Sequence, residues 1–313
     1  MLCGLQLFPW ARLSHAHRHP TTQGQGASAA LEPQGVTVSW LSIAASRPWR
    51  KDRAMTQDDL TDTEPTPDWA KGVRAVTALT GAGISTDSGI PDFRGRKSSV
   101  YATLPTPSFH EYISDPGVRR QSWQRRRDHP AWRAEPNPAH HALTELARSD
   151  IDTWVISQNI DGLHAKSGTP PDRLLELHGN MFGAMCVSCG DRTAMTDALA
   201  RVEAGDEDPA CRRCGGILKS TTVMFGENLH PETFQRAVQV AGDCDLFLAI
   251  GSTLVVEPAA SLCGIAAHVG AALVIVNRDP TPYDHMAKAV IHEPIGIAVP
   301  RLITQIIQAN KRH

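Results

Sequence analysis

The fold is decided by the stretch Val73-Arg-Ala-Val-Thr-Ala-Leu-Thr-Gly81-Ala82-Gly83-Ile84-Ser85 in this chain of 313 residues. A short apolar run that ends in a glycine-rich turn is typical of a buried strand that leads into a loop. Two glycines let the backbone approach a pyrophosphate, and backbone N–H groups and a serine hydroxyl can donate to its oxygens. Thr86 stands where the full dinucleotide-binding fingerprint has glycine, so this stretch alone fits an ordinary turn equally well.

Similar apolar runs recur along the chain and are separated by helical stretches. One helix is expected over Pro138–Arg148, after the helix-start signal Asn137-Pro138. Strands that alternate with helices predict an α/β fold, in which a parallel sheet is covered by helices on both faces. The further strands are expected at Thr153–Ser157, Leu174–Leu177, Leu246–Ile250 and Leu273–Val276.

Two cysteine motifs interrupt this alternation: Cys186-Val-Ser-Cys189-Gly190 and Cys211-Arg-Arg-Cys214-Gly215. Thiolates three residues apart on a tight turn can bind one metal ion, and the glycine after each pair permits the turn. Chance pairs or disulfides are the alternatives. Because both motifs carry the glycine, we expect a four-cysteine structural Zn²⁺ site in a small inserted module. Such a site has no open coordination position, so the chemistry must lie elsewhere.

The composition restricts the class of protein. Hydrophobic residues make up 41% of the chain, and no apolar run approaches the about 20 residues that span a bilayer. Only Cys3, Cys244 and Cys263 lie outside the two motifs, which favours a reducing intracellular compartment, and we expect the cytoplasm. The net charge of −2 argues against nucleic acid as the primary ligand.

Residues 1–54 differ from the rest of the chain. They hold six Lys/Arg and two acidic residues (net +4), whereas Met55 onward holds 25 and 31 (net −6). An organelle transit peptide, a disordered polar tract and a His-rich metal site are possible interpretations, and a transit peptide would make the location organellar. We favour a translation start at Met55. A leader and linker are expected over residues 1–68.

Polar side chains follow each later expected strand. Gln158-Asn159-Ile-Asp161 follows the second, His178-Gly-Asn180 the third, Gly251-Ser252-Thr253 the fourth and Asn277 the fifth. The carboxyl ends of parallel strands meet at one edge of the sheet, where open α/β folds bind ligands. Hydroxyl, amide and imidazole groups are what ribose hydroxyls, phosphates and a carboxamide require.

These motifs, in this order, resemble those of the sirtuin family. The resemblance covers roughly residues 70–305 and includes Ile90-Pro-Asp92-Phe93-Arg94-Gly, Val223-Met-Phe225-Gly226-Glu and Gly251-Ser-Thr-Leu. It implies a catalytic domain over 69–313 with a Rossmann-like sheet. It also implies a smaller zinc-bearing domain, built from insertions at about 96–135 and 181–222.

The resemblance further implies an NAD-dependent protein-lysine deacylase. In sirtuins the acyl oxygen attacks C1′ of the nicotinamide ribose, and the products are nicotinamide, O-acyl-ADP-ribose and free lysine. His178 would be the general base that draws a proton through the ribose hydroxyls, which suits an imidazole with a pKa of about 6.5. A lone histidine at a strand end is otherwise more often structural. Asn159 and Asp161 would orient the ribose and a nearby water.

The cofactor contacts are implied residue by residue. Asp92 would bind the carboxamide, and Phe93 would shield C1′ after nicotinamide leaves. Arg94 would hold the phosphates by charge-assisted hydrogen bonds, together with Ala82 and Ser85. The other cofactor-binding residues are expected to be Gly81, Gly83, Gln158, Gly251, Ser252, Thr253 and Asn277.

The acyl-lysine would lie as a strand between the 223–227 segment and the segment after Gly251. The substrate-binding residues expected in the first segment are Val223, Phe225 and Gly226. Desuccinylating sirtuins carry a Tyr-x-x-Arg motif for the acidic acyl group, and the matching stretch here is Trp123-Gln-Arg-Arg126. Because Trp123 lacks the phenol, we expect acetyl-lysine or a longer apolar acyl-lysine to be preferred over succinyl-lysine. Trp123 as a core residue of its helix is the alternative.

Other activities compete with this interpretation. Protein ADP-ribosylation from NAD is the alternative within the same fold, because both reactions pass through an electrophilic C1′. A zinc-ribbon adaptor would not need His178, Asn159 and Asp161 together at strand ends, and a nicotinamide dehydrogenase would need the complete fingerprint. The expected ligands are thus NAD, one structural Zn²⁺ and acylated protein lysines, with no membrane partner.

Overall fold

The computed structural model describes residues 66–92 and 106–311. The expected leader, the start at Met55, and the predicted cofactor residues Phe93 and Arg94 lie outside the described residues. Within them, six strands form one sheet in which every neighbouring pair is parallel. They are β1 Ala75–Thr80, β2 Asp152–Ser157, β3 Leu174–Glu176, β7 Leu246–Ile250, β8 Ala272–Val276 and β9 Ala289–Ile291.

The predicted α/β fold is confirmed, since all five expected apolar runs are strands of this sheet. Every residue of β7 is buried, as expected for a strand covered on both faces. The sequence did not predict β9, because its three residues are only half-buried at the sheet edge and form no distinct apolar run.

The strand order β3-β2-β1-β7-β8-β9 reverses between β1 and β7. The chain first adds strands on one side of β1 and later adds strands on the other side. Loops that leave the carboxyl ends of β1 and β7 therefore lead in opposite directions. Open α/β folds bind their ligands in the crevice at such a switch point.

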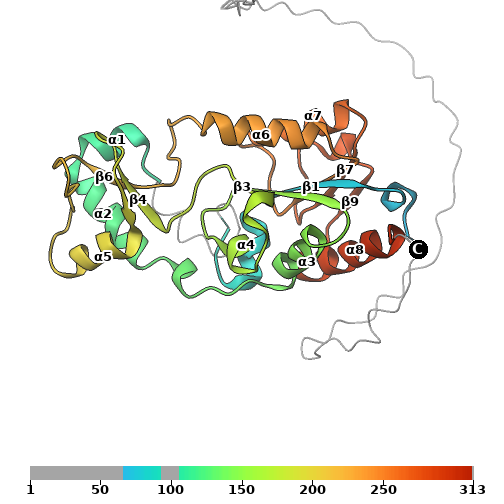
Figure 1. The fold of residues 1–313 in the computed structure, drawn as a ribbon, viewed down its shortest axis with the longest axis horizontal. Coiled ribbons are helices and arrows are strands. Elements are labelled where there is room, and N and C mark those ends of the chain that lie inside the picture. Colours follow the sequence, from blue (N-terminus) through green and yellow to red (C-terminus); the bar gives the residue numbers. More distant parts are fainter. Residues whose placement is uncertain (1–65, 93–105, 312–313) are drawn as a thin grey trace, which may run out of the picture. The chain divides into compact units, whose positions relative to one another are not determined.

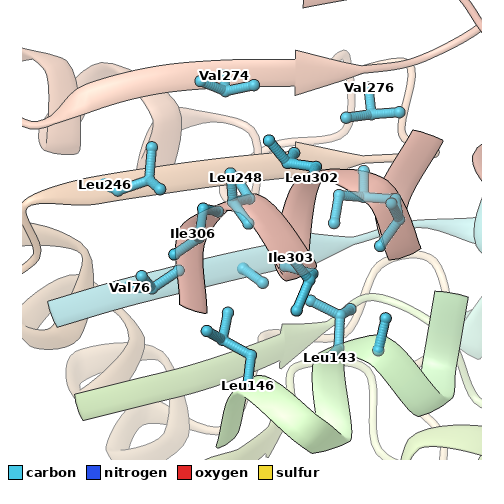
Figure 2. Packing of buried hydrophobic residues seen from close by; sticks show 14 of the residues in the cluster. Val76, Leu143, Leu146, Leu246, Leu248, Val274, Val276, Leu302, Ile303 and Ile306 are labelled. Carbon is cyan, nitrogen blue, oxygen red and sulfur yellow. The ribbon is translucent and has the colours of Figure 1, made fainter. Parts of the chain in front are cut away.

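Helices cover both faces of the sheet (Figure 1). The helices α3 Pro138–Ala147 and α8 Ile295–Ala309 pack on one face, and α6 Pro231–Gly242 and α7 Ser261–His268 pack on the other. Figure 2 shows the first of these interfaces, where Leu143 and Leu146 of α3 and Ile303 and Ile306 of α8 meet the strand side chains. These two apolar layers hold the strand ends, and the loops that follow them, in fixed positions.

A second, antiparallel sheet has the order β5-β4-β6. Its strands are β4 Gly183–Cys186, β5 Arg192–Ala194 and β6 Leu218–Ser220. The helices around it are α1 Phe109–Ser114, α2 Pro116–Arg127 and α5 Met195–Glu203. Trp123 of α2 is buried against this sheet and α5, and the Tyr112 hydroxyl of α1 donates to the Leu218 carbonyl at 2.8 Å. The segments around 96–135 and 181–222 thus pack together where the structure describes them, as one small module.

Short elements complete the described chain. They are the 3₁₀ turns Asp68–Ala70, Ala82–Ser88, Pro130–Trp132, Pro171–Arg173 and Asp284–Met286, and the helix α4 Leu163–Lys166. The turn Ala82–Ser88 follows β1 and contains most of the glycine-rich motif. None of the described helices has both the length and the apolar character needed to cross a bilayer.

Candidate active site

The loops after β1 and β7 touch at the switch point. Gly83 N donates to Gly251 O at 2.8 Å, and a Cβ on Gly83 would lie 2.8 Å from the Gly251 Cα. Gly251 has φ +63°, and its own Cβ would lie 2.5 Å from Ile84 N. A side chain at either position would displace backbone, so only glycine allows the two loops to approach this closely.

A cavity of about 1100 Å³ opens at this edge of the sheet. Its size suits a large ligand, since ligand pockets are typically about 300–1,000 Å³. The cavity gathers these predicted site residues: Gly81, Ala82, Gly83, Ser85, Asp92, Arg126, Gln158, Asn159, Asp161, His178, Val223, Phe225, Gly226, Gly251, Ser252, Thr253 and Asn277. A smaller cavity of about 450 Å³ beside α3 contains none of them.

Ser85, Asn159 and Asp161 form a hydrogen-bonded cluster that joins the β1 and β2 loops. The Ser85 hydroxyl donates to Asp161 Oδ2 at 2.7 Å, and Asn159 Nδ2 donates to Ser85 Oγ at 3.2 Å. Asn159 Nδ2 also donates to the Gly81 carbonyl at 3.1 Å. Burial raises the pKa of Asp161, although the Leu163 amide and the Ser85 hydroxyl both oppose this by bonding to the carboxylate. The cluster fixes these polar groups at the cavity wall.

His178 follows β3 and is half-buried at the same wall. Its Nδ1 lies 2.7 Å from the Gln158 carbonyl oxygen, which can only accept, so Nδ1 carries the proton and Nε2 carries a lone pair. Burial lowers the pKa of His178, and the bond to Gln158 only partly offsets this effect. The imidazole is therefore neutral at pH 7 and can act as a base through Nε2.

Polar contacts also link the strand ends on the far side of the switch point. Gln158 Nε2 donates to Ser252 Oγ at 3.0 Å, which connects the β2 and β7 loops. Asn277 Nδ2 donates to the Asp279 carbonyl at 2.7 Å, and His292 Nδ1 donates to the Asn277 carbonyl at 2.8 Å. These hydrogen bonds join the end of β2 to that of β7, and the end of β8 to that of β9.

The 223–227 segment forms a tight turn. Glu227 N donates to Met224 O at 3.0 Å, and Gly226 at the third position has φ +89°. A positive φ at that position is what a type II turn requires. The Phe225 side chain at the corner is 60% exposed. Phe225 forms an isolated parallel bridge with Ser108, in which Phe109 N donates to the Phe225 carbonyl at 2.8 Å. Among the described residues, the Gly226 amide has no hydrogen-bond partner.

The four cysteines of the two motifs converge in the small module. Their Sγ atoms all lie within 4.8 Å of one another, with Cys186 and Cys214 at 3.5 Å and Cys189 and Cys211 at 3.7 Å. A disulfide would need about 2.05 Å. Tetrahedral Zn²⁺ with Zn–S bonds of about 2.3 Å would separate the sulfurs by about 3.8 Å. The donor set therefore fits one structural zinc ion, as the spacing predicts.

Comparison with known proteins agrees with this geometry. The model of the Sir2 family matches residues 81–258, which is more than half of the chain. The chain belongs to the Sir2 family. NAD-dependent protein deacetylase 2 of Streptomyces coelicolor is 48% identical to this sirtuin over 237 residues, 74% of this chain and 98% of the relative. The NAD-dependent protein deacetylase of Sulfolobus acidocaldarius is 42% identical over 229 residues, 73% of this chain and 89% of the relative.

Solved Sir2 structures have the same fold as this sirtuin. A structure described as a basis for the mechanism and regulation of Sir2 enzymes gives a TM-score of 0.69 at 36% identity, and covers 77% of this chain and 95% of its own. A Sir2 complex with a p53 peptide and NAD⁺ gives 0.68 at 33% identity, and covers 76% and 95%. The resemblance to sirtuins predicted from the motifs is confirmed.

Trp123 of this sirtuin lies in the small module's core. Its side chain is fully buried beside Cys186 and Met195, and its indole nitrogen has no hydrogen-bond partner in the part of the chain that the structure describes. Arg126, one turn later on α2, lines the cavity and donates to Thr222 Oγ1 at 3.3 Å. This burial fits the alternative interpretation of Trp123, as a core residue, better than a contact with a substrate.

Several cavity residues of this sirtuin were not predicted from the sequence. They include Arg125, His129, Arg278, His292, Glu293 and Ile295. His292 and Glu293 directly follow β9, so recognising that edge strand would have found them by the strand-end rule. Arg125 and His129 lie on or just after α2, and no local sequence signal shows which face of that helix meets the cavity.

Proposed function

We propose that this sirtuin is an NAD-dependent protein-lysine deacylase that produces nicotinamide, O-acyl-ADP-ribose and free lysine. The observation that carries this proposal is the neutral His178 at the wall of the large cavity, where the loops after β1, β2 and β7 meet. The relatives named as NAD-dependent protein deacetylases support it.

The cavity residues suit NAD, which supplies an electrophilic C1′ at its nicotinamide ribose when it is bound. Ala82 and Ser85 lie in the turn that follows β1 and line the cavity, and they are assigned to the phosphates together with Gly81. Gln158, Ser252 and Thr253 line the cavity and would hold the riboses, and Asn277 would take the adenosine side in place of the missing fingerprint acid. Asp92 binds the carboxamide. Phe93 is assigned to shield C1′, and Arg94 is assigned to bind the phosphates.

His178 acts as the general base. Its Nε2 accepts a proton from a ribose hydroxyl, and the Nδ1–H bond to the Gln158 carbonyl keeps the ring in the tautomer that this step needs. Asn159 and Asp161 orient the ribose and the water near it. Because Ser85 and Asp161 are already hydrogen-bonded to each other, little reorganisation is needed when the substrates bind.

The acylated peptide binds beside the turn at Met224–Glu227. Val223, Phe225 and Gly226 line the cavity, and so do residues of the segment after Gly251. The Gly226 amide in the first segment can pair with the backbone of an extended peptide. Arg126 lines the cavity, whereas buried Trp123 offers it no polar contact, so acetyl-lysine is the expected substrate in preference to succinyl-lysine.

The cysteines support the proposals of a bound zinc ion and of the cytoplasm as the compartment. One Zn²⁺, held by Cys186, Cys189, Cys211 and Cys214, is structural, because four thiolates leave no position for a substrate. The buried Cys244 and Cys263 are free thiols, which supports the cytoplasm as the compartment.

Mass spectrometry of an acetyl-lysine peptide incubated with NAD and this protein tests the proposal. The peptide should lose its acetyl group and O-acetyl-ADP-ribose should appear, both only when NAD is present. A peptide or protein that instead gains ADP-ribose would establish the transferase alternative. An unchanged peptide with intact NAD would contradict both activities. A matched succinyl-lysine peptide in the same assay checks the expected acyl preference.

A further inference from the structure

Lys219 is the only buried lysine among the described residues. It lies on β6 of the small sheet, and its side chain is 6% exposed. An ammonium group removed from water is costly unless its donors are satisfied by close acceptors. Its position therefore requires a physical reason.

Three acceptors surround the Lys219 ammonium. Nζ lies 3.0 Å from Glu227 Oε2 and donates to the Thr222 carbonyl at 2.9 Å and the Ser220 carbonyl at 3.2 Å. Since an ammonium has three donors, every donor has a partner. Two of the acceptors belong to the first and last residues of the Thr222–Glu227 segment. One lysine side chain thus holds both ends of that segment.

The Glu227 carboxylate also makes a hydrogen bond within the turn. Glu227 Oε2 accepts a hydrogen bond from Met224 N at 2.8 Å, in addition to its ion pair with Lys219. Upstream, Val223 N donates to the His178 carbonyl at 2.9 Å. The position of the turn is therefore coupled to Lys219 on one side and to the backbone of His178 on the other.

Lys219 also connects the turn to the metal-bearing sheet. It lies on β6, which pairs with β4, and Leu218 beside it is the register partner of Cys186. Lys219 does not line the cavity, whereas Phe225, Gly226 and its partner Glu227 do. Lys219 can thus influence a substrate only through Glu227 and the turn that it holds.

We propose that Lys219 and Glu227 are positioning residues for the acylated substrate. Their ion pair fixes the Thr222–Glu227 segment so that the Gly226 amide can pair with the substrate backbone. The inference rests on the proposed function, because it names residues that position the substrate of that same site. Loss of the pair should weaken peptide binding and leave NAD binding unchanged.

The test measures KM for an acetyl-lysine peptide and for NAD in zinc-loaded wild-type protein and three variants. In Lys219→Met the peptide KM should rise about 10- to 100-fold, the cost of a misplaced binding group. Glu227→Gln should have a smaller effect, because an amide oxygen can still accept from Met224 N. The double variant Lys219→Met/Glu227→Gln should recover melting temperature, since no charge is left unpaired, but should not recover the peptide KM.

Asp208→Asn is the matched control. The Arg119–Asp208 pair lies in the same module at 2.7 Å, with side chains 11% and 26% exposed, against 6% and 22% for Lys219 and Glu227. This control should lower the melting temperature without changing the peptide KM. The proposal is overturned by an unchanged peptide KM in Lys219→Met, or by an equal rise in Asp208→Asn.

Amide hydrogen exchange separates this inference from the proposed function. A wild-type protein that releases no free lysine would refute the proposed function, but exchange at Met224 N and Glu227 N would still report on the turn. Both amides should exchange faster in Lys219→Met than in wild type or in Asp208→Asn. Equal exchange in all three proteins would overturn the role of the ion pair.

Discussion

The tautomer and the neutral state of His178 are set by its surroundings in the fold. The Gln158 carbonyl at 2.7 Å fixes the proton on Nδ1, and burial keeps the ring neutral. Neither effect is visible in the local sequence His178-Gly-Asn180, which gives only the residue type at a strand end. The sequence could therefore predict a candidate base, and the fold was needed to show its tautomer.

The pH dependence of kcat/KM should follow the lowered pKa of His178. A base must be unprotonated to accept a proton, so activity should be lost as the pH falls through that pKa. Because burial lowers the pKa, the midpoint of the acid limb should lie below the usual histidine value of 6.5.

His129 provides the control for this profile. It lines the same cavity, and burial, aided by the nearby Arg126 charge, lowers its pKa to about 4. His129→Gln should leave the acid limb in place. A midpoint above 6.5, or a limb that moves in His129→Gln, would show that another group is titrating.

Alanine substitutions at two glycines with positive φ distinguish the effect of backbone strain from the effect of steric contact. Gly251→Ala would place a Cβ 2.5 Å from Ile84 N, whereas a Cβ on Gly270 (φ +95°) would have nothing within 4 Å of it. Both substitutions should cost about 1–2 kcal/mol of stability from the left-handed conformation. Only Gly251→Ala should also raise KM for NAD, by about tenfold or more, because it displaces the loop that binds phosphates. Equal NAD KM values in the two variants would contradict the proposal that the closely packed loops at Gly83 and Gly251 bind the phosphates of NAD.

At the level of elements, burial on both faces made the central strands predictable. Leu246–Ile250 is a continuous apolar run and was placed with its observed bounds. The strands of the small sheet were not predicted, because each is only three or four residues long. Stretches this short do not show the apolar run or the alternation that would identify a strand.

The orientation of helix α2 is a second feature that could not be predicted from the sequence. The Trp123-Gln-Arg-Arg126 stretch lies in α2, and its sequence does not show which side of the helix faces the cavity. Trp123 turns into the module core, and Arg126 turns to the cavity. The packing of α2 against α5 and the small sheet sets this rotation, and both partners come from a segment some 60 residues later in the chain.

Removal of one zinc ligand should disrupt the small module. In Cys186→Ala we expect loss of stoichiometric zinc together with activity, because binding energy at a four-cysteine site contributes directly to folding. Cys244→Ala is the control, since Cys244 is a buried thiol that belongs to the core of the central sheet. It should keep both zinc and turnover. Active wild-type protein without bound zinc would contradict the structural role.

For the whole molecule, two buried histidines predict loss of stability in acid. Burial lowers the pKa of His140 to about 4 and of His164 to about 3. Between pH 6.5 and these values the unfolded chain binds protons that the folded chain does not, so stability falls as the pH falls. Across that window His140 should contribute on the order of 3 kcal/mol and His164 on the order of 5 kcal/mol.

Urea unfolding at pH 7.5, 5.5 and 4.5 measures this effect. The raised pKa values of Asp161 and Glu176 act in the opposite direction, so the comparison with His164→Gln is needed to isolate the histidine. The variant should lose less stability between pH 7.5 and 4.5 than wild type. The exposed His141 is the control site, and His141→Gln should keep the wild-type pH dependence. An identical pH dependence in His164→Gln would contradict the prediction.

The candidate site could be predicted because a parallel sheet collects distant segments at one edge. Gly81, Asn159, His178 and Gly251 are widely separated in the sequence and line one cavity. The position of a residue after a strand identifies such residues, but it does not identify side chains that influence the site without lining the cavity. Lys219 is one of these, since its role depends on three acceptors that only the folded chain brings together.

The most direct test of the account is the rate of free-lysine formation by His178→Ala, with NAD and an acetyl-lysine peptide. General bases contribute about 10²–10⁴-fold, so the variant should lose at least about 100-fold in kcat while retaining its zinc content and melting temperature. Wild-type protein should form free lysine only when NAD is present. A correctly folded His178→Ala protein with turnover near that of wild type would contradict the proposed catalytic base.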